Sequence, residues 1–505
     1  MKNQLCKMVY LGMLLVFLSI LISCEKMLDE SPKSIISPND FFTTEAQCIQ
    51  ATNGVYSSLT SIFGDESLWA LTFSGTDLFL FNGGSATIKS YQDYTFSASA
   101  SAPSYTTWNR CYEGIKNANM VISKVEKSPI DQTAKLRLLG EVKYLRALYY
   151  YILTNVFGDV PLWTDELDVN KISELGRSPL NEVRIQIIYD LIDAEKGLSW
   201  TVSAAEVGRV TKGAALGLLA KVHLFNKEWK DAADIAERII NEGPYELLDY
   251  TDIFSETNKN KNNKESIFEI QYSRNAATGQ NFIVNHFYTW FFPTRDGTTA
   301  TYSGVNFGTI DLESYPEFYP STKLANLYEP GDKRKQFVIA NGYNGQEFKS
   351  FPRHLADLTK QFPWFGPKFW DLTALKRASE KNLYFMRFGE IILIYAEALN
   401  ELSRTPEAIT QLNKVRNRAN LSNLPALPQD EVRQYIMDER ARELVGEFQR
   451  KWDLMRWGNL VETVRSIAND NPVGAQNVKE YHKFFPIPYD EIVKNPNLQQ
   501  NDGYE

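Results

Sequence analysis

Histidine is scarce in this chain, and the common catalytic motifs are missing. The histidines are His223, His286, His354 and His482. They form no His-Glu-x-x-His motif and no Cys/His cluster, so the sequence predicts no metal site. A Gly-x-Ser-x-Gly elbow, a phosphate loop and a dinucleotide fingerprint are also missing. These absences argue against the enzyme classes that those motifs serve, and we expect no cofactor.

Runs of positive charge are missing as well. The 505 residues include 54 Lys and Arg against 62 Asp and Glu, which gives a formal charge of −8. This balance argues against nucleic-acid binding through a charged face. Beyond the first twenty-four residues, no stretch is long and apolar enough to cross a bilayer, so we expect one soluble body there.

The first twenty-four residues have the pattern of a secretory leader. Lys2 and Lys7 precede an apolar run over residues 8–22, and Ser23 and Cys24 follow it directly. This pattern predicts a lipoprotein signal peptide over residues 1–23, a lipidated Cys24 and a tether over 24–37. An uncleaved transmembrane helix is the alternative, but the run is shorter than the ~20 residues that a span requires.

Only two cysteines remain once the leader and the lipidated residue are set aside. Cys48 and Cys111 could form one disulfide in an exported protein, or they could be two buried thiols at helical positions. Aromatic residues, in contrast, are abundant, with 10 Trp, 26 Tyr and 29 Phe. Many lie in stretches rich in Gly, Pro and Asn, where packing in a helix seam does not explain them.

Apolar residues at helical spacing predict a mainly α protein. The expected helices begin near residue 38 and cover 105–125, 136–157 and 179–198, and helix pairs of tetratricopeptide type are expected over 213–244 and 384–420. The predicted organisation is an N-terminal helical scaffold over 38–244 that contains an aromatic loop at 63–104, a loop-rich ligand-binding region over 245–381, and C-terminal helical repeats with a tail over 382–505. The aromatic loop could contain a short hairpin.

Three glutamates in the C-terminal part look at first like an acid/base site. Glu439, Glu443 and Glu447 are spaced four residues apart, and arginines lie between and after them. This spacing puts the three carboxylates on one helix face, where they can pair with arginines. We therefore interpret the group as structural rather than catalytic.

Ten sequence blocks in order resemble the SusD/RagB family, the nutrient-binding lipoproteins of Gram-negative glycan-utilisation systems. The resemblance covers essentially the whole chain. Besides the lipobox, the blocks include Asn53-Gly54-Val55-Tyr56, Trp108-Asn109-Arg110, Gly140-Glu141-Val142-Lys143-Tyr144-Leu145-Arg146-Ala147, Phe157-Gly158-Asp159-Val160-Pro161-Leu162, Arg387-Phe388-Gly389-Glu390, Asn413-Lys414-Val415-Arg416-Asn417-Arg418-Ala419, Glu439-Arg440-Ala441-Arg442-Glu443-Leu444, Trp452-Asp453-Leu454-Met455-Arg456-Trp457 and Phe485-Pro486-Ile487-Pro488.

The resemblance implies a fold, a ligand, a location and a partner. The fold is a right-handed superhelix of four tetratricopeptide-like helix pairs with an irregular ligand-binding subdomain. The ligand is an oligosaccharide, bound without catalysis at the cell surface by a protein that is lipid-anchored in the outer membrane. The partner is a TonB-dependent, SusC-like outer-membrane barrel. A peptide cargo is the alternative within this class, and a surface glycoside hydrolase or a purely protein-binding scaffold are alternatives outside it.

The resemblance places the ligand-binding residues in the first loop and in the central irregular region. Sugar rings offer an apolar face to aromatic side chains and hydroxyls to polar ones. The predicted ligand-binding residues are Asp77, Phe81, Asn82, Tyr94, Trp290, Arg295 and Trp364. The alternative for each aromatic residue is that it only packs its loop onto the scaffold.

Overall fold

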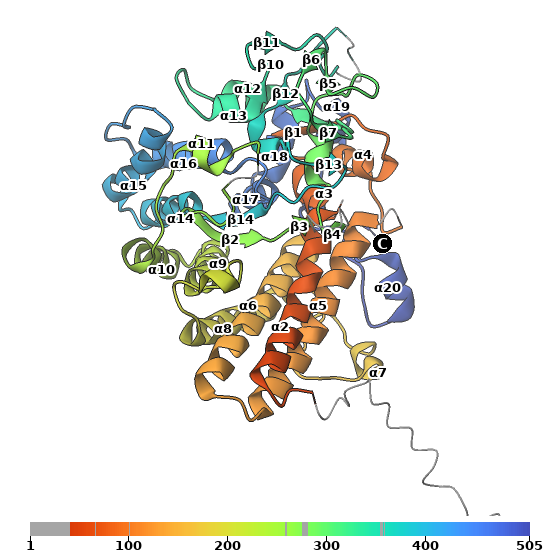
Figure 1. Cartoon of the computed structure of the whole chain (residues 1–505), viewed down its shortest axis with the longest axis vertical. Coiled ribbons are helices and arrows are strands. Elements are labelled where there is room, and N and C mark those ends of the chain that lie inside the picture. Colours follow the sequence, from red (N-terminus) through yellow and green to blue (C-terminus); the bar gives the residue numbers. More distant parts are fainter. Residues whose placement is uncertain are drawn as a thin grey trace, which may run out of the picture.

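The computed structural model describes residues 41–65, 67–99, 102–257, 260–274, 281–353, 357 and 359–504. Long helices form one half of the molecule, and short strands and loops cover the other half (Figure 1). The predicted mainly helical fold with tetratricopeptide-like pairs is confirmed. The leader, Cys24, the tether and His354 lie outside the described residues. None of the helices in the described part combines the length and the hydropathy that a bilayer span requires.

The N-terminal scaffold consists of the long helices that the apolar period predicts. They are α2 (Glu45–Gly64), α5 (Ala102–Lys127), α6 (Gln132–Phe157) and α8 (Leu180–Gly197), with the short α7 (Val169–Ile172) between the last two. Thr44 caps α2 in a reciprocal capping box with Gln47, so this helix starts later than the Pro38 that the sequence suggested. Helix α6 packs against both α5 and α8. Arg146 on α6 is buried and pairs with Asp190 on α8 at 2.6 Å.

Two helix pairs continue the scaffold. The first is α9 (Lys212–Asn226) with α10 (Trp229–Glu242), and the second is α14 (Phe388–Glu401) with α15 (Thr405–Arg418). Ala220 and Ala232 are fully buried, and their small side chains allow α9 and α10 to approach closely. Helix α14 also packs against α10, which joins the two pairs. The prediction of a helix over residues 384–387 was wrong, because these residues belong to strand β14 (Leu383–Arg387).

The region 245–381 is built from short strands arranged in two-stranded sheets. The longest pair is β2 (Ser266–Ile270) antiparallel to β14, with a bulge at Tyr384–Met386. Short helices α11 (Tyr250–Ile253), α12 (Thr322–Leu327) and α13 (Lys335–Val338) lie between strands. The other strands are β3 (Ser273–Arg274), β4 (Asn281–Ile283), β5 (Thr301–Tyr302), β6 (Val305–Asn306), β7 (Asp311–Leu312), β8 (Phe318–Pro320), β9 (Ile339–Ala340), β10 (Gly342–Tyr343), β11 (Gln346–Glu347), β12 (Trp364–Phe365) and β13 (Leu375–Lys376).

The segment 63–104 is more regular than a loop. It contains α3 (Leu68–Phe73), β1 (Phe79–Phe81) and α4 (Ala86–Asp93). The suggestion of a local hairpin was wrong, because β1 pairs with β8, more than 200 residues further along the chain. Helices this short show too few turns for an apolar period to be recognised in the sequence.

Aromatic rings from distant parts of the chain meet in the core. Phe73 stacks on Phe79 with centroids 4.4 Å apart, and Phe79 contacts Phe291 and Phe365 from the central region. Phe448 from the C-terminal part closes the cluster against Phe73. The abundance of aromatic residues is therefore explained largely by the packing of loops onto the scaffold.

The C-terminal part returns to the N-terminal scaffold. Its helices are α16 (Gln429–Leu444), α17 (Arg450–Trp457), α18 (Leu460–Ser466), α19 (Pro472–Asn477) and α20 (Tyr489–Lys494). After α19, the backbone N–H of Phe485 donates to the Val156 carbonyl at 2.8 Å, and the Asn501 amide donates to the Phe157 carbonyl at 2.9 Å. Cys48 and Cys111 are both buried free thiols, so the disulfide alternative is wrong.

Candidate functional site

Asp77 is fully buried and holds two parts of the chain together. Its carboxylate accepts two hydrogen bonds from Arg450, at 2.8 and 2.6 Å, and pairs with Lys323 at 2.7 Å. Burial by itself raises the pKa of this carboxyl, but Arg450 and Lys323 outweigh it and lower the pKa to about 2. Both carboxylate oxygens of Asp77 are thus engaged within the protein.

The two aromatic residues predicted in the first loop also face the core. Phe81 is completely buried against Phe318, and Tyr94 is 3% exposed. The Tyr94 hydroxyl donates to the Gly75 carbonyl at 2.5 Å, which ties α4 to the turn before β1. Both positions favour the alternative in which the ring packs a loop onto the scaffold.

The two predicted tryptophans are buried as well. Trp290 is 6% exposed and lies 5.5 Å from Trp69, and Trp364 is 3% exposed with its indole N–H donating to the Ser350 carbonyl at 2.9 Å. The Trp290 indole N–H is buried and has no hydrogen-bond acceptor among the described residues. Neither ring offers a broad face to a ligand in this conformation.

Asn82 and Arg295 are the predicted residues with appreciable exposure. Arg295 pairs with Asp311 at 3.0 Å and supports the turn at 295–302. The Asn82 backbone N–H donates to the Glu317 carbonyl at 2.7 Å, and the Glu317 N–H donates to the Trp290 carbonyl at 3.2 Å. The fold thus brings two of the predicted residues, Asn82 and Trp290, together around Glu317, which was not predicted.

Beside this junction lies an aromatic side chain that is exposed. Tyr315 follows β7 and is 44% exposed, while its backbone N–H donates to the Thr289 carbonyl at 2.8 Å. That hydrogen bond anchors the backbone while the ring remains at the surface. An exposed tyrosine ring is the kind of surface on which a sugar face stacks.

Arg377 contacts the Tyr315 ring from a neighbouring turn. Strands β13 and β7 are paired, and the Glu313 N–H donates to the Lys376 carbonyl at 2.8 Å, which places the turn at 375–378 beside Tyr315. The guanidinium carbon of Arg377 lies 4.8 Å from the Tyr315 ring centroid. The pairing of two short strands therefore determines this contact.

Glu317 completes the site, which we call the Tyr315 patch and define as Asn82, Gly84, Tyr315, Glu317 and Arg377. One carboxylate oxygen of Glu317 accepts from the Gly84 N–H at 3.2 Å, and the other is buried without a hydrogen-bond partner among the described residues. Burial raises the pKa of this carboxyl, while the Gly84 N–H and Arg377 oppose the rise.

Gly83, next to Gly84, leaves room for the Glu317 carboxylate in this position. A Cβ atom at Gly83 would lie 2.1 Å from the Glu317 carboxylate. The Gly83-Gly84 pair was visible in the sequence, but its contact with Glu317 was not.

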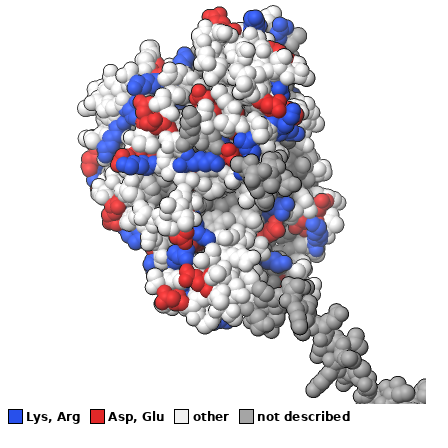
Figure 2. Space-filling model, viewed as in Figure 1, with Lys and Arg blue, Asp and Glu red and all other residues white. Residues whose placement is uncertain are grey.

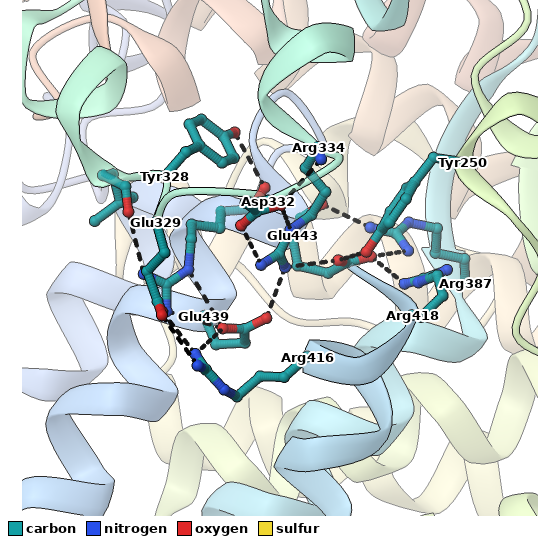
Figure 3. Close-up of polar contacts among 12 residues, drawn as sticks. Tyr250, Tyr328, Glu329, Asp332, Arg334, Arg387, Arg416, Arg418, Glu439 and Glu443 are labelled. Carbon is teal, nitrogen blue, oxygen red and sulfur yellow. Dashed lines mark hydrogen bonds and ion pairs between the residues drawn. The ribbon is translucent and has the colours of Figure 1, made fainter. Parts of the chain in front are cut away.

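The glutamates interpreted as structural form a buried network with arginines (Figure 3). The Glu443 carboxylate accepts from Tyr250 at 2.6 Å, from Arg334 at 3.0 Å and from Arg387 at 2.5 Å. Arg387 also donates to Glu447 at 2.9 Å. The prediction that these carboxylates pair with arginines is confirmed, and the network connects the central region to α16.

The other clefts and acidic groups of the described residues form no second site of chemistry that the geometry supports. No group of three or more His, Cys, Asp or Glu side chains there is arranged to hold a metal ion. Two further clefts lie away from the Tyr315 patch, one of about 350 Å³ between Trp200 and Phe268 and one of about 420 Å³ beside Arg177. On the face drawn in Figure 2, basic and acidic side chains are interspersed and no broad field of one sign forms.

The helix pairs, together with the loop-rich region that presents Tyr315, identify the chain as a helical-repeat protein with an irregular region packed on its scaffold. Two family models match this chain, one described as "SusD family" over residues 264–504 and one as "Starch-binding associating with outer membrane" over residues 26–224. The chain belongs to the SusD/RagB family.

Several known proteins are similar over most of their length. SusD-like protein P25 of Formosa agariphila is 28% identical over 519 residues, which cover 95% of this chain and 96% of that protein. Starch-binding protein SusD of Bacteroides thetaiotaomicron is 24% identical over 426 residues, 73% of either chain. A solved structure described as a laminarin binding SusD-like protein has a TM-score of 0.74 and 26% identity, and covers 92% of this chain and 100% of that one.

Proposed function

We propose that this chain is a non-catalytic binding protein for oligosaccharides, and that the Tyr315 patch is its binding surface. The observation that carries the proposal is the exposed Tyr315 ring, which Arg377 contacts on the loop-rich surface, two residues before Glu317 in the chain. An aromatic face with a few converging polar groups matches the alternation of apolar faces and hydroxyls in a sugar. The laminarin-binding relative and the starch-binding family description support the same ligand class.

Binding without catalysis fits the chemistry of the patch. Hydrolysis of a glycoside needs two carboxyl groups ~5 to 10 Å apart on either side of the scissile bond. The patch as defined contains one carboxylate, Glu317, with one oxygen held by the Gly84 N–H. Cleavage of oligosaccharides by the purified protein would favour the hydrolase alternative, and selective binding of peptides would favour a peptide cargo.

Removing the aromatic platform should weaken ligand binding without harming the fold. We expect Tyr315→Ala to weaken binding of the oligosaccharide by about tenfold, since stacking contributes roughly 1 kcal/mol beyond area burial and ~1.4 kcal/mol corresponds to a factor of ten. Isothermal titration calorimetry with laminarin fragments and with a panel of neutral and acidic oligosaccharides measures the affinity. Thermal melting shows whether the variant remains folded.

Tyr189 provides the matched control for this experiment. It is 62% exposed on α8, in the helical scaffold rather than on the loop-rich surface. Tyr189→Ala should leave the affinity unchanged. An equal loss in both variants, or no loss in Tyr315→Ala, would place the binding surface elsewhere.

The proposal includes a location and a partner. A lipid-anchored Cys24 would hold the protein on the outer membrane at the cell surface, where it would deliver the oligosaccharide to a TonB-dependent, SusC-like barrel. The family description that mentions association with the outer membrane supports the location. Co-purification of such a barrel with the affinity-tagged full chain tests the partner.

Loss of the lipidated cysteine should release the protein from the membrane. We expect Cys24→Ala to leave the protein in the soluble fraction or with an uncleaved leader, because two or three acyl chains provide the stable attachment. Membrane fractionation and labelling with a fatty-acid probe measure the result. Cys48→Ala is the control, since this thiol is buried in α2. Retention of Cys24→Ala in the labelled membrane fraction would contradict the anchor.

A further inference from the structure

The Arg377 side chain lacks an acceptor for its charge. The structure describes many buried and half-buried arginines, and each of the others donates at least one hydrogen bond to a carboxylate, an amide or a carbonyl. Among the described residues, Arg377 alone in this set has no hydrogen bond and no ion pair. Its one recorded contact is with the Tyr315 ring, and its Nε–H is buried without a partner.

The turn that carries Arg377 holds the side chain at the edge of the Tyr315 patch. Leu375 and Ala378 exchange backbone hydrogen bonds at 3.0 and 2.9 Å, so Lys376 and Arg377 occupy the tip of a tight turn. Lys376 has counter-ions, because it pairs with Asp311 at 3.3 Å and with Glu313 at 3.9 Å. The exposed Lys376 therefore has carboxylate partners, whereas the adjacent, half-buried Arg377 has none among the described residues.

The groups that face Arg377 do not replace the missing partner. The Glu317 carboxylate is near enough for its pKa to be influenced by Arg377, but the two side chains form no ion pair, and Gly84 holds one oxygen. On the other side, His286 faces Asp65 at 3.8 Å. Burial lowers the pKa of His286, Asp65 opposes this and Arg377 adds to it.

An arginine that is partly removed from water without a counter-ion is costly to the free protein. A ligand that brings an anionic group offsets this cost through charge-assisted hydrogen bonds, which are about twice as strong as those with a neutral hydroxyl. The planar guanidinium suits carboxylate or sulfate oxygens in a bidentate arrangement. The stacking surface for a sugar ring lies directly beside it.

We propose that the Tyr315 patch takes an acidic oligosaccharide, with a sugar ring on Tyr315 and an anionic group of the sugar on Arg377. This inference rests on the proposed function and specifies its ligand class. A uronic acid carboxylate and a sulfate ester offer the same chemistry to Arg377, so the experiment separates these two sources.

The test compares matched pairs of ligands that differ only in charge. Fragments of pectin, alginate and glucuronan are titrated beside their carboxyl-reduced forms, and fragments of a sulfated galactan beside their desulfated form. We expect the charged member of at least one pair to bind about tenfold more tightly. Raising the salt concentration should narrow the difference, because exposed charge interactions are screened.

Variants of the turn assign this preference to Arg377. Arg377→Gln should remove most of the preference for the charged member, and Arg377→Lys should keep part of it, since the charge remains and the bidentate geometry is lost. Lys376→Gln is the control for general surface charge, and it should keep the preference. The melting temperature of Arg377→Gln should stay within a few degrees of the natural protein, because no protein acceptor is lost.

The outcomes distinguish the inference from the function on which it rests. If the neutral members bind as well as or better than the charged ones, the acidic ligand is overturned while oligosaccharide binding stands. An equal loss of both members in Arg377→Gln would show that Arg377 only positions Tyr315. If neither the neutral nor the charged members bind, oligosaccharide binding itself is overturned.

Discussion

Replacing Glu443 with alanine is expected to lower the free energy of unfolding by about 3–5 kcal/mol, the cost of breaking a buried ion pair by removing one partner. Glu443 is 1% exposed and lies among the guanidinium groups of Arg334, Arg387 and Arg418 (Figure 3). Burial alone raises the pKa of this carboxyl, but the three arginines outweigh it and hold the pKa well below its usual range. The alanine variant leaves these charges buried with fewer acceptors.

Two further variants separate charge from size in this experiment. Glu443→Gln keeps the volume and an acceptor for the Tyr250 hydroxyl, so it should cost less than Glu443→Ala. Glu407→Ala removes an exposed carboxylate that pairs with Arg404, and it should leave the free energy of unfolding almost unchanged. Denaturant unfolding measures all three. Unchanged stability together with lost ligand binding would move Glu443 from the scaffold to the binding site.

The second large effect is expected at Lys451, where substitution should stabilise the protein. Lys451 is 2% exposed, forms no ion pair among the described residues, and lies with its ammonium 3.9 Å from the Phe485 ring centroid. Burial lowers the pKa of this amine from 10.5 to about 7. A shift of this size corresponds to about 4–5 kcal/mol, of which cation–π attraction recovers about 2. We therefore expect Lys451→Met to gain about 2–3 kcal/mol at pH 7.

The gain from Lys451→Met should depend on pH in a defined direction. The pKa of the folded state is depressed, so below pH 7 both states carry the charge and the natural protein bears the full cost of burying it. As pH rises from 7 to 10.5 the folded state loses the proton first, the cost shrinks, and the advantage of the variant should disappear.

The free energy of unfolding of Lys451→Met is compared with that of the natural protein at each pH. This comparison is needed because Lys368 and Lys381 also have pKa values lowered by burial, to about 8, and titrate between pH 7 and 10.5. Lys230→Met, at a residue with an exposed side chain, should show no such trend. A constant difference between pH 7 and pH 10 would contradict the explanation.

The helical scaffold was predictable because its signal is local. An apolar side chain every three or four residues predicted α5, α6 and α8 within a few residues of their ends. The start of α2 was predicted too early, since the capping interaction of Thr44 with Gln47 rather than Pro38 sets the first turn. Short helices such as α3 and α4, and the strand β14 before α14, were missed because they complete too few periods.

The candidate site was predictable only in part. The sequence pointed to the loop after the first helix and to the central region, the two segments that also supply the proposed Tyr315 patch, and it named Asn82, which lies in that patch. It preferred Trp290 and Trp364 over Tyr315 because large rings in loops look equally available when burial is unknown. The structure buries both indoles and exposes Tyr315, although all three lie in similar Pro- and Phe-rich stretches.

By itself, the sequence determined the helical class, the family and the pairing of the glutamate group with arginines, since each depends on residues close together in the chain or on a pattern kept over its whole length. Only the tertiary structure decided which aromatic rings are exposed and which arginine lacks a counter-ion. Both properties depend on contacts across long sequence separations, such as β1 with β8 and β7 with β13. Pairing of such short strands adds little stability by itself, so the packing of the whole molecule decides which strands pair. Strands of two or three residues are also too short to show a period in the sequence.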